Sequence, residues 1–341
     1  DSNGLNYQGE DDTYIVEYDT SGQTVSIVYS GATVGWIPES DVDVTDAPVA
    51  PPTQKAIFGY GSTGSDVSMS NLVSSSGVVA ADVTGVGTAR SGSAAAGYGT
   101  DKAIFAYGYA GGNVSMSNLV NSSGVVAADV TGVGTARYAL AAATYGLDKA
   151  IFGYGTSGSN VSLTNLVSNS GVVAADVTGV GTARKVLAAA GYGTDKAIFG
   201  YGYSSGDPGV SLTNLVSNSG VVSADVTGVG TARQAPTAVG YGGDKAIFGY
   251  GNNGVSQLSL TNLVSNTGVV SADVTGVGTA RSILAAAGYG GDKAIFGYGT
   301  AASGAVSLTN LVSSSGVVAA DVTGVGTARN YVAAAGYSIS A

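Results

Sequence analysis

The chain lacks two residue types entirely, because none of its 341 residues is cysteine or histidine. The absence of cysteine excludes disulfides, thiolate metal sites and a cysteine nucleophile. The absence of histidine removes the side chain that most often acts as general base or metal ligand near neutral pH. We therefore expect neither a metal nor a cofactor, and we predict that the protein is not an enzyme.

Long apolar runs are also missing. No stretch of eighteen apolar residues occurs, so no transmembrane helix and no membrane insertion are predicted. No secretory signal pattern is found, and the first residue is Asp1 rather than methionine. This start indicates that the chain is processed or is part of a longer protein.

Basic residues are absent from positions 1–54, where ten of the chain's 23 acidic residues lie. The other 13 acidic residues and all 13 Lys and Arg residues lie in 55–341, so they balance. The net charge of −10 therefore belongs to the N-terminal piece. A neutral main body does not attract phosphate backbones or anionic lipid surfaces, so no nucleic-acid partner is expected.

The N-terminal piece is predicted to form a small module. Residues 13–19 and 24–29 alternate apolar and polar side chains around a turn, which is typical of a β-hairpin, and residues 35–38 can add a short third strand or turn. The proline-rich text that follows is typical of a stiff linker. The predicted organisation is an acidic hairpin module at 1–46, a linker at 47–54 and a main domain at 55–341.

Six copies of one text fill the main domain. The core KAIFGYG, which reads KAIFAYG in the second copy, recurs at intervals of 47, 47, 47, 49 and 48 residues. The copies begin at Lys55, Lys102, Lys149, Lys196, Lys245 and Lys293. A fixed period in this range indicates repeated supersecondary units stacked on one another.

Each repeat contains four short runs rich in Val, Ile, Tyr, Phe and Thr. In the copy that starts at Leu140 they read LAAATYG, KAIFGYG, VSLTNLVS and GVVAADVTG, separated by Gly, Ser and Asn. These compositions favour β-strands, and frequent Gly without a 3.6-residue period argues against helices. Four strands in each repeat match one propeller blade. We predict an all-β protein, a six-bladed propeller with four-stranded blades.

Side-chain size predicts the order of strands across a blade. Blades converge on the propeller axis, so the Ala-rich run is expected to be the innermost strand a, followed by KAIFGYG as b, VSLTNLVS as c and GVVAADVTG as the outer d. The first KAIFGYG has no Ala-rich run before it, whereas the chain ends with a spare one at 332–337. We predict that this C-terminal strand completes the first blade and leaves no open edge.

An Arg precedes the Ala-rich run in each repeat, and Gly-Tyr-Gly ends the next run, as at 153–155. This pattern resembles kelch-type propeller repeats, in which an Arg precedes the inner strand and a Gly pair closes the second strand. The Trp of the kelch outer strand is missing from every copy. The resemblance implies a propeller over residues 55–341.

Two charged residues recur once in every repeat. They are Arg90, Arg137, Arg184, Arg233, Arg281 and Arg329, and Asp82, Asp129, Asp176, Asp225, Asp273 and Asp321. A catalytic site needs its acid and base in different environments, whereas six equivalent copies indicate an architectural role. We predict that these residues tie neighbouring blades together. The alternative is an ion site on the axis.

Variation between the repeats gathers in the b–c connections and at the residue after each Arg. In an up-and-down blade both places lie on one face, which we call the b–c face. The residues predicted to bind there are Tyr109, Tyr138, Lys185, Tyr203, Asp207 and Tyr331. Tyr among Ser, Gly and Asn is typical of adaptable recognition surfaces. The alternative is neutral drift in permissive loops.

The text KAIFGYG…SLTNLVSNSGVV…DVTGVGTAR, with YIVEYD and GWIP in the N-terminal piece, resembles tail-fibre and appendage proteins of bacteriophages, particularly marine ones. The resemblance implies a non-enzymatic structural or attachment protein of the extracellular virion. Its expected partners are other fibre proteins or further copies of the chain, and its expected ligands are host-surface carbohydrates or proteins.

Two other classes of function stay open. A secreted bacterial surface adhesin or lectin would use the same face of the propeller. A glycan-degrading enzyme would need paired carboxylates. In the main domain only Asp66 and Asp207 depart from the repeat pattern, and they lie in loops of well-separated blades.

Overall fold

The computed structural model describes residues 27–29, 36–38 and 53–340. The chain divides into two compact units, Asp1–Pro51 and Pro52–Ala341. In the first unit β1 (Ile27–Tyr29) pairs antiparallel with β2 (Trp36–Pro38). Strand β2 lies in the segment 35–38, which was predicted as a third strand or turn. It pairs with the end of the predicted strand 24–29. The other predicted hairpin strand, 13–19, lies outside the described residues, and the predicted domain bounds stay predictions.

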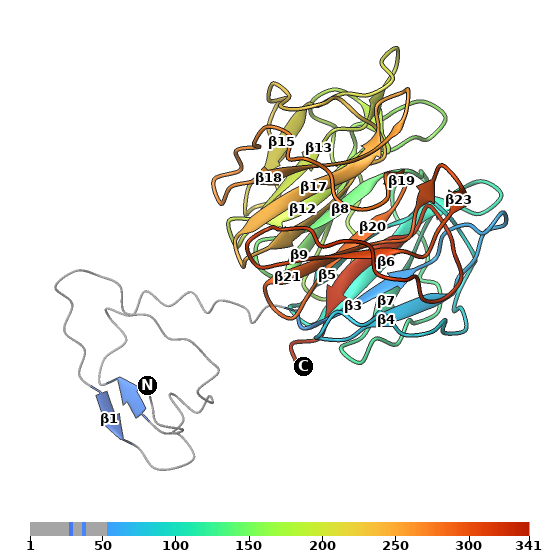
Figure 1. The fold of residues 1–341 in the computed structure, drawn as a ribbon. Helices are drawn as coiled ribbons and strands as arrows, with labels where there is room; N and C mark the ends of the chain where they lie inside the picture. The colour runs from blue at the N-terminus through green and yellow to red at the C-terminus, as the bar shows by residue number, and fades with distance from the viewer. Residues whose placement is uncertain (1–26, 30–35, 39–52, 341) are drawn as a thin grey trace. The chain divides into compact units, whose positions relative to one another are not determined.

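The second unit is a six-bladed propeller with Ala-rich strands around its axis (Figure 1). Each of these inner strands packs against the next, and the sixth packs against the first. Small side chains allow this approach: a Cβ added at Gly336 would lie 3.1 Å from the carbonyl oxygen of Gly288 on the neighbouring strand. The inner strands are β5 (Ala94–Tyr98), β8 (Ala141–Tyr145), β12 (Ala188–Tyr192), β16 (Thr237–Tyr241), β20 (Ala285–Tyr289) and β25 (Ala333–Tyr337).

The KAIFGYG text forms the second strand of every blade and pairs antiparallel with the inner strand. Its Ile and Phe side chains are fully buried between blades. The second strands are β3 (Lys55–Gly59), β6 (Lys102–Tyr109), β9 (Lys149–Gly153), β13 (Lys196–Gly200), β17 (Lys245–Asn252) and β21 (Lys293–Gly297).

The third strands complete the regular part of each sheet. They are β4 (Ser70–Val73), β7 (Asn113–Val120), β10 (Thr164–Val167), β15 (Thr213–Val216), β18 (Gln257–Val264) and β24 (Thr309–Val312). Five short strands, β11 (Arg184–Lys185), β14 (Tyr203–Ser204), β19 (Arg281–Ser282), β22 (Thr300–Ala301) and β23 (Gly304–Ala305), extend the fourth and sixth blades.

The outer segment of each blade differs from the continuous fourth strand that the sequence predicts. In the first blade its backbone pairs with β4 at two isolated bridges, Val73↔Val79 and Ser70↔Val83, and the Asn71 side chain of β4 donates to it. The carboxylate of Asp82 lies beside the second bridge and accepts hydrogen bonds from Thr327 of the neighbouring connection. The backbone therefore follows this anchor between blades instead of the edge of the sheet, and the other five blades repeat the arrangement.

The C-terminal strand closes the ring as predicted. Strand β25 pairs with β3 over five residue pairs, from Ala333↔Gly59 to Tyr337↔Lys55. The backbone N–H of Gln54 donates to the carbonyl of Ser338 at 2.7 Å and extends the pairing. In Figure 1 the C-terminal end of the chain accordingly lies beside β3. The first blade is thus built from both ends of the repeat array, and the fold class is confirmed.

The core of the propeller consists of six apolar clusters, one between each pair of neighbouring blades. In each cluster the Gly-Tyr-Gly tyrosine of one blade meets the KAIFGYG phenylalanine of the next. Tyr154 and Phe199 form such a pair, with ring centroids 5.2 Å apart in edge-to-face geometry. Edge-to-face pairs stabilise beyond their buried area, so the repeated aromatic pair helps to fix the blade-to-blade angle.

Candidate functional site

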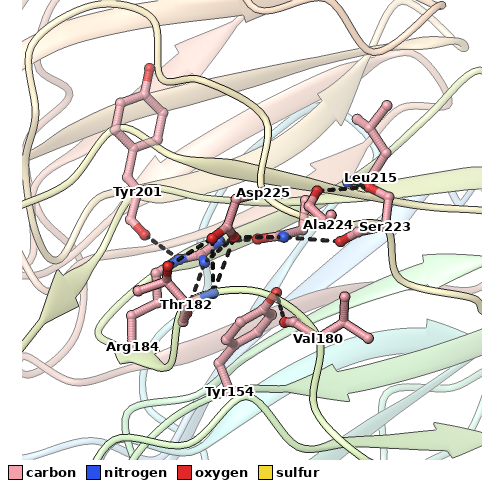
Figure 2. A network of polar contacts seen from close by, with 10 residues as sticks. Tyr154, Val180, Thr182, Arg184, Tyr201, Leu215, Ser223, Ala224 and Asp225 are labelled. Atoms are coloured by element: carbon pink, nitrogen blue, oxygen red, sulfur yellow. Dashed lines mark hydrogen bonds and ion pairs between the residues drawn. The ribbon is translucent and has the colours of Figure 1, made fainter.

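A buried Arg joins each pair of neighbouring blades, and Figure 2 shows Arg184 between the third and fourth blades. Its Nε donates to the Tyr201 carbonyl at 2.9 Å, and its Nη2 donates to Asn214 Oδ1 at 2.6 Å. Its guanidinium carbon lies 4.5 Å from the ring centroid of Tyr154, which belongs to the preceding blade. The side chain is fully buried. Arg184 therefore links two blades through one planar group.

An Asp completes this link. Asp225 accepts hydrogen bonds from the Thr182 hydroxyl at 2.7 Å and from Asn214 Nδ2 at 2.9 Å, and its Oδ1 lies 3.7 Å from Arg184 Nη1. Burial raises the pKa of Asp225, but the hydrogen bonds from Thr182 and Asn214 and the charge of Arg184 outweigh it, so the net pKa is lowered. The carboxylate therefore stays ionised at neutral pH.

In all six copies of this Arg–Asn–Asp clamp the Arg Nη2, the Asn and the Asp have equivalent partners, whereas the Arg Nε donates to a tyrosine carbonyl in only three copies. The Arg residues are 90, 137, 184, 233, 281 and 329, and their Nη2 groups donate to Asn118, Asn165, Asn214, Asn262, Asn310 and Asn71, which donate to Asp129, Asp176, Asp225, Asp273, Asp321 and Asp82. Arg329 closes the ring by reaching Asn71 of the first blade. Each carboxylate accepts hydrogen bonds from a Thr and an Asn, and each Arg Nη2 donates to that Asn, so the clamp residues chiefly bind one another.

The Asn of the clamp was not singled out from the sequence. It recurs at the same place in VSLTNLVS and its side chain is fully buried in every copy. A polar amide repeated inside an apolar strand was the available signal, because buried amides need partners. Within the described residues no three acidic side chains gather closely enough to hold a metal ion.

The start of each inner strand lies beside the end of the second strand. Ser91 forms a bridge with Tyr109, Tyr138 with Thr156, and Lys185 pairs with Tyr203. The d–a and b–c connections therefore share one face, as the strand order predicts. The variable residues of the repeats lie together on it.

The predicted binding residues fall into two groups on this face. Tyr109 and Tyr138 make an edge-to-face contact with centroids 5.8 Å apart. Tyr331 lines the opening of the axis nearby; burial and, secondarily, Tyr138 raise the pKa of its hydroxyl. In the fourth blade Lys185 Nζ lies 5.4 Å from the Tyr203 ring centroid. Asp207 is exposed in the loop that follows Tyr203.

A ring of backbone hydrogen bonds surrounds the opening of the axis on the b–c face. One residue from each blade donates its N–H to the carbonyl of the equivalent residue in the neighbouring blade. The six donor–acceptor pairs are Gly92–Tyr331 (3.2 Å), Ala139–Gly92 (2.8 Å), Val186–Ala139 (2.8 Å), Ala235–Val186 (2.7 Å), Ile283–Ala235 (3.1 Å) and Tyr331–Ile283 (3.2 Å). All six residues have positive φ. This conformation is costly for β-branched residues such as Val186 (φ 46°) and Ile283 (φ 57°), so the ring of bonds must hold it in place.

Two cavities follow this ring into the axis. The outer cavity has a volume of about 80 Å³ and the inner one about 100 Å³, and each is lined by residues from all six blades. The outer cavity contains the positive-φ residues and the residues that follow them in sequence, such as Ser93 and Leu140. Ser93 and Gly92 were not predicted as site residues, although SGSAAAG departs from the LAAAGYG pattern there.

No protein-family model matches this chain, and no curated protein sequence matches it. Among the described residues none belongs to a helix of the length and apolar character needed to span a membrane.

Proposed function

We propose that this chain is a non-enzymatic attachment or structural component of a virus particle, a part of a bacteriophage fibre or appendage. It presents its propeller to host-surface carbohydrates or proteins, or to neighbouring particle proteins. The support from sequence is the resemblance of the repeats to bacteriophage tail-fibre proteins. The support from geometry is the distribution of residues between the two faces of the propeller.

The b–c face carries the variable connections and the four tyrosines outside the fixed repeat positions. The opposite face carries the a–b turns, where the backbone N–H of each turn donates to the next blade, for example Gly146 to the Asp195 carbonyl at 2.7 Å. The propeller begins and ends at that opposite face, because Gln54 bonds to Ser338 there. The variable face is thus the one remote from both ends of the propeller, and this observation carries the proposal.

Enzymatic glycan cleavage has little support on the described b–c face. The two carboxylates outside the repeat pattern, Asp66 and Asp207, lie in the first and fourth blades, on opposite sides of a six-bladed ring. Glycoside hydrolysis needs two carboxyl groups roughly 5–10 Å apart. The arrangement favours binding over catalysis.

The test replaces Tyr109, Tyr138, Tyr203 and Tyr331 together by Ala and measures attachment to host cells by labelled protein or by particles that carry the variant. We expect attachment to fall strongly while the far-ultraviolet spectrum stays that of the parent. A matched control replaces the exposed Val78, Val125, Val172 and Val221 of the outer segments by Ala. Unchanged attachment after the loss of all four tyrosines would favour loop drift.

A second measurement tests the location. Antibodies against the propeller should detect the chain in purified particles. Its recovery only from a bacterial envelope fraction would support the secreted adhesin or lectin instead.

A further inference from the structure

The opening of the propeller axis is asymmetric on the b–c face. The residues that follow the hydrogen-bonded ring line this opening, and five of the six are apolar: Leu140, Leu187, Pro236, Leu284 and Val332. The sixth is Ser93, in the second blade. One hydroxyl thus interrupts a row of apolar side chains, and it does so at a single blade.

The hydroxyl of Ser93 has no hydrogen-bond partner among the described residues. Ser93 is only 7% exposed, and it lines both axial cavities. Burying a polar group without a partner costs folding free energy, and Leu occupies this position in three other blades without that cost. A hydroxyl kept at such a place indicates that a partner reaches it from the cavity.

Aromatic side chains lie near Gly92, the residue that precedes Ser93. Gly92 is the only glycine of the hydrogen-bonded ring, and a Cβ there would lie 3.2 Å from Tyr138 Cδ2. The absence of a side chain lets the Tyr138 ring lie against the backbone next to Ser93. Tyr331 lines the cavity on the other side and accepts the hydrogen bond from Gly92, while Tyr109 contacts Tyr138. Tyr109, Tyr138 and Tyr331, which come from three blades, therefore lie on the side of the opening that holds Ser93, the one polar residue among the six that follow the ring.

We propose that this opening is a binding subsite for a terminal, uncharged hexose, whose exocyclic hydroxymethyl group enters the cavity and hydrogen-bonds to Ser93. The proposal rests on the proposed function and names its ligand class. Aromatic rings stack on the apolar faces of sugars, and the hydroxyl supplies the directional contact. No charged side chain lines the cavity, which disfavours acidic sugars. The cavity, with a volume of about 80 Å³, opens on the b–c face, so a hydroxymethyl group can enter it.

The experiment titrates the intact protein with the methyl glycosides of glucose, galactose and mannose and follows binding by nuclear magnetic resonance. At least one glycoside should bind, and its 6-deoxy counterpart, which lacks the exocyclic hydroxyl, should bind roughly tenfold more weakly. Equal binding of the two forms would overturn the role of the hydroxymethyl group. Failure of all three glycosides to bind would overturn the ligand class.

Two substitutions and one control locate the site. Ser93→Leu fills the cavity with the residue that other blades use, so it should fold at least as well as the parent and abolish glycoside binding. Ser93→Ala should remove the difference between the hexose and its 6-deoxy form. The control Val172→Ala changes an exposed residue of an outer segment that does not line the opening, and it should bind like the parent. Parent-like binding by Ser93→Leu would overturn the site.

Attachment assays separate this inference from the function on which it rests. Loss of attachment in both Ser93→Leu and the four-tyrosine variant supports the two together. If Ser93→Leu attaches like the parent and the four-tyrosine variant does not, the b–c face functions without this subsite and only the inference fails. If both variants attach like the parent, the proposed function fails as well.

Discussion

The clamps between blades and the opening on the b–c face are built on the same six-fold plan, yet their side chains behave in opposite ways. In the clamp, Arg, Asn and Asp are identical in all six copies, because each atom of the network depends on the others. Around the opening, the ring positions are Gly, Ala, Val, Ala, Ile and Tyr. There the main chain makes the repeated bonds, so the side chains are free to differ. The comparison shows that a ring fixed by backbone atoms can accept a different side chain at each position without losing its symmetry.

The largest effect should come from opening the six-bladed ring, on which both regions depend. Deleting 332–341 removes β25, which exposes the edge of β3 and uncovers the residues of the two neighbouring inner strands that pack against β25. Unpaired strand edges lead to aggregation, so we expect loss of the cooperative melting transition and of the monomer peak in size-exclusion chromatography. The control deletes only 339–341. Parent-like melting of the longer deletion would show that the ring closes elsewhere.

The second largest effect, a loss of unfolding free energy, should follow from the removal of one clamp. Arg184→Met leaves Asn214 and Asp225 without their buried partner, and removal of one member of a buried pair costs about 3–5 kcal/mol of unfolding free energy. Urea denaturation measures it. Arg233→Met should cost less, because the Nε of Arg233 has no hydrogen-bond partner whereas that of Arg184 donates to Tyr201. Equal costs would show that this Nε contact contributes nothing.

Acid should weaken the clamps and leave the backbone ring at the opening unaffected. The pKa of each clamp Asp is lowered in the folded protein, by hydrogen bonds from Thr and Asn that outweigh the effect of burial. A lowered folded pKa stabilises the protein above the unfolded pKa of about 4, and this contribution is lost as pH falls below that value toward the folded pKa. Unfolding free energies measured from pH 7 to pH 3 should therefore decline below about pH 4. Asp225→Asn should reduce the decline, and a pH-independent stability would contradict this account.

The smallest effect is expected from removing the charged N-terminal unit. Deleting 1–51 takes away the net negative charge and none of the clamp residues or the ring at the opening. The melting temperature of the remaining propeller should stay near that of the full chain, as measured by calorimetry. A large drop would mean that the acidic unit stabilises the propeller.

The architecture could be predicted because it depends on features that a linear sequence displays. The Ala-rich runs mark the crowded axis, and the unmatched run at 332–337 reveals the closing strand. The outer segment was predicted less well, because its Asp is held by a Thr of the neighbouring connection, 41–43 positions away in five blades and 245 away across the closure. Asn214 was missed since one polar residue in a strand gives no sign of its partners. Ser93 was missed for a related reason: its importance depends on the five apolar residues that only the closed ring brings beside it.

The pairing of β25 with β3 places the seam of the ring inside a blade, between its first strand and its second. Every blade, including the first, therefore combines the Ala-rich strand at the end of one repeat with the second and third strands of the next repeat. Recombination between any two repeats of the gene would add or remove whole blades while the two strands at the seam stayed the same. The number of blades can thus change during evolution without a new way of closing the ring, and each added blade brings one new variable position to the opening on the b–c face.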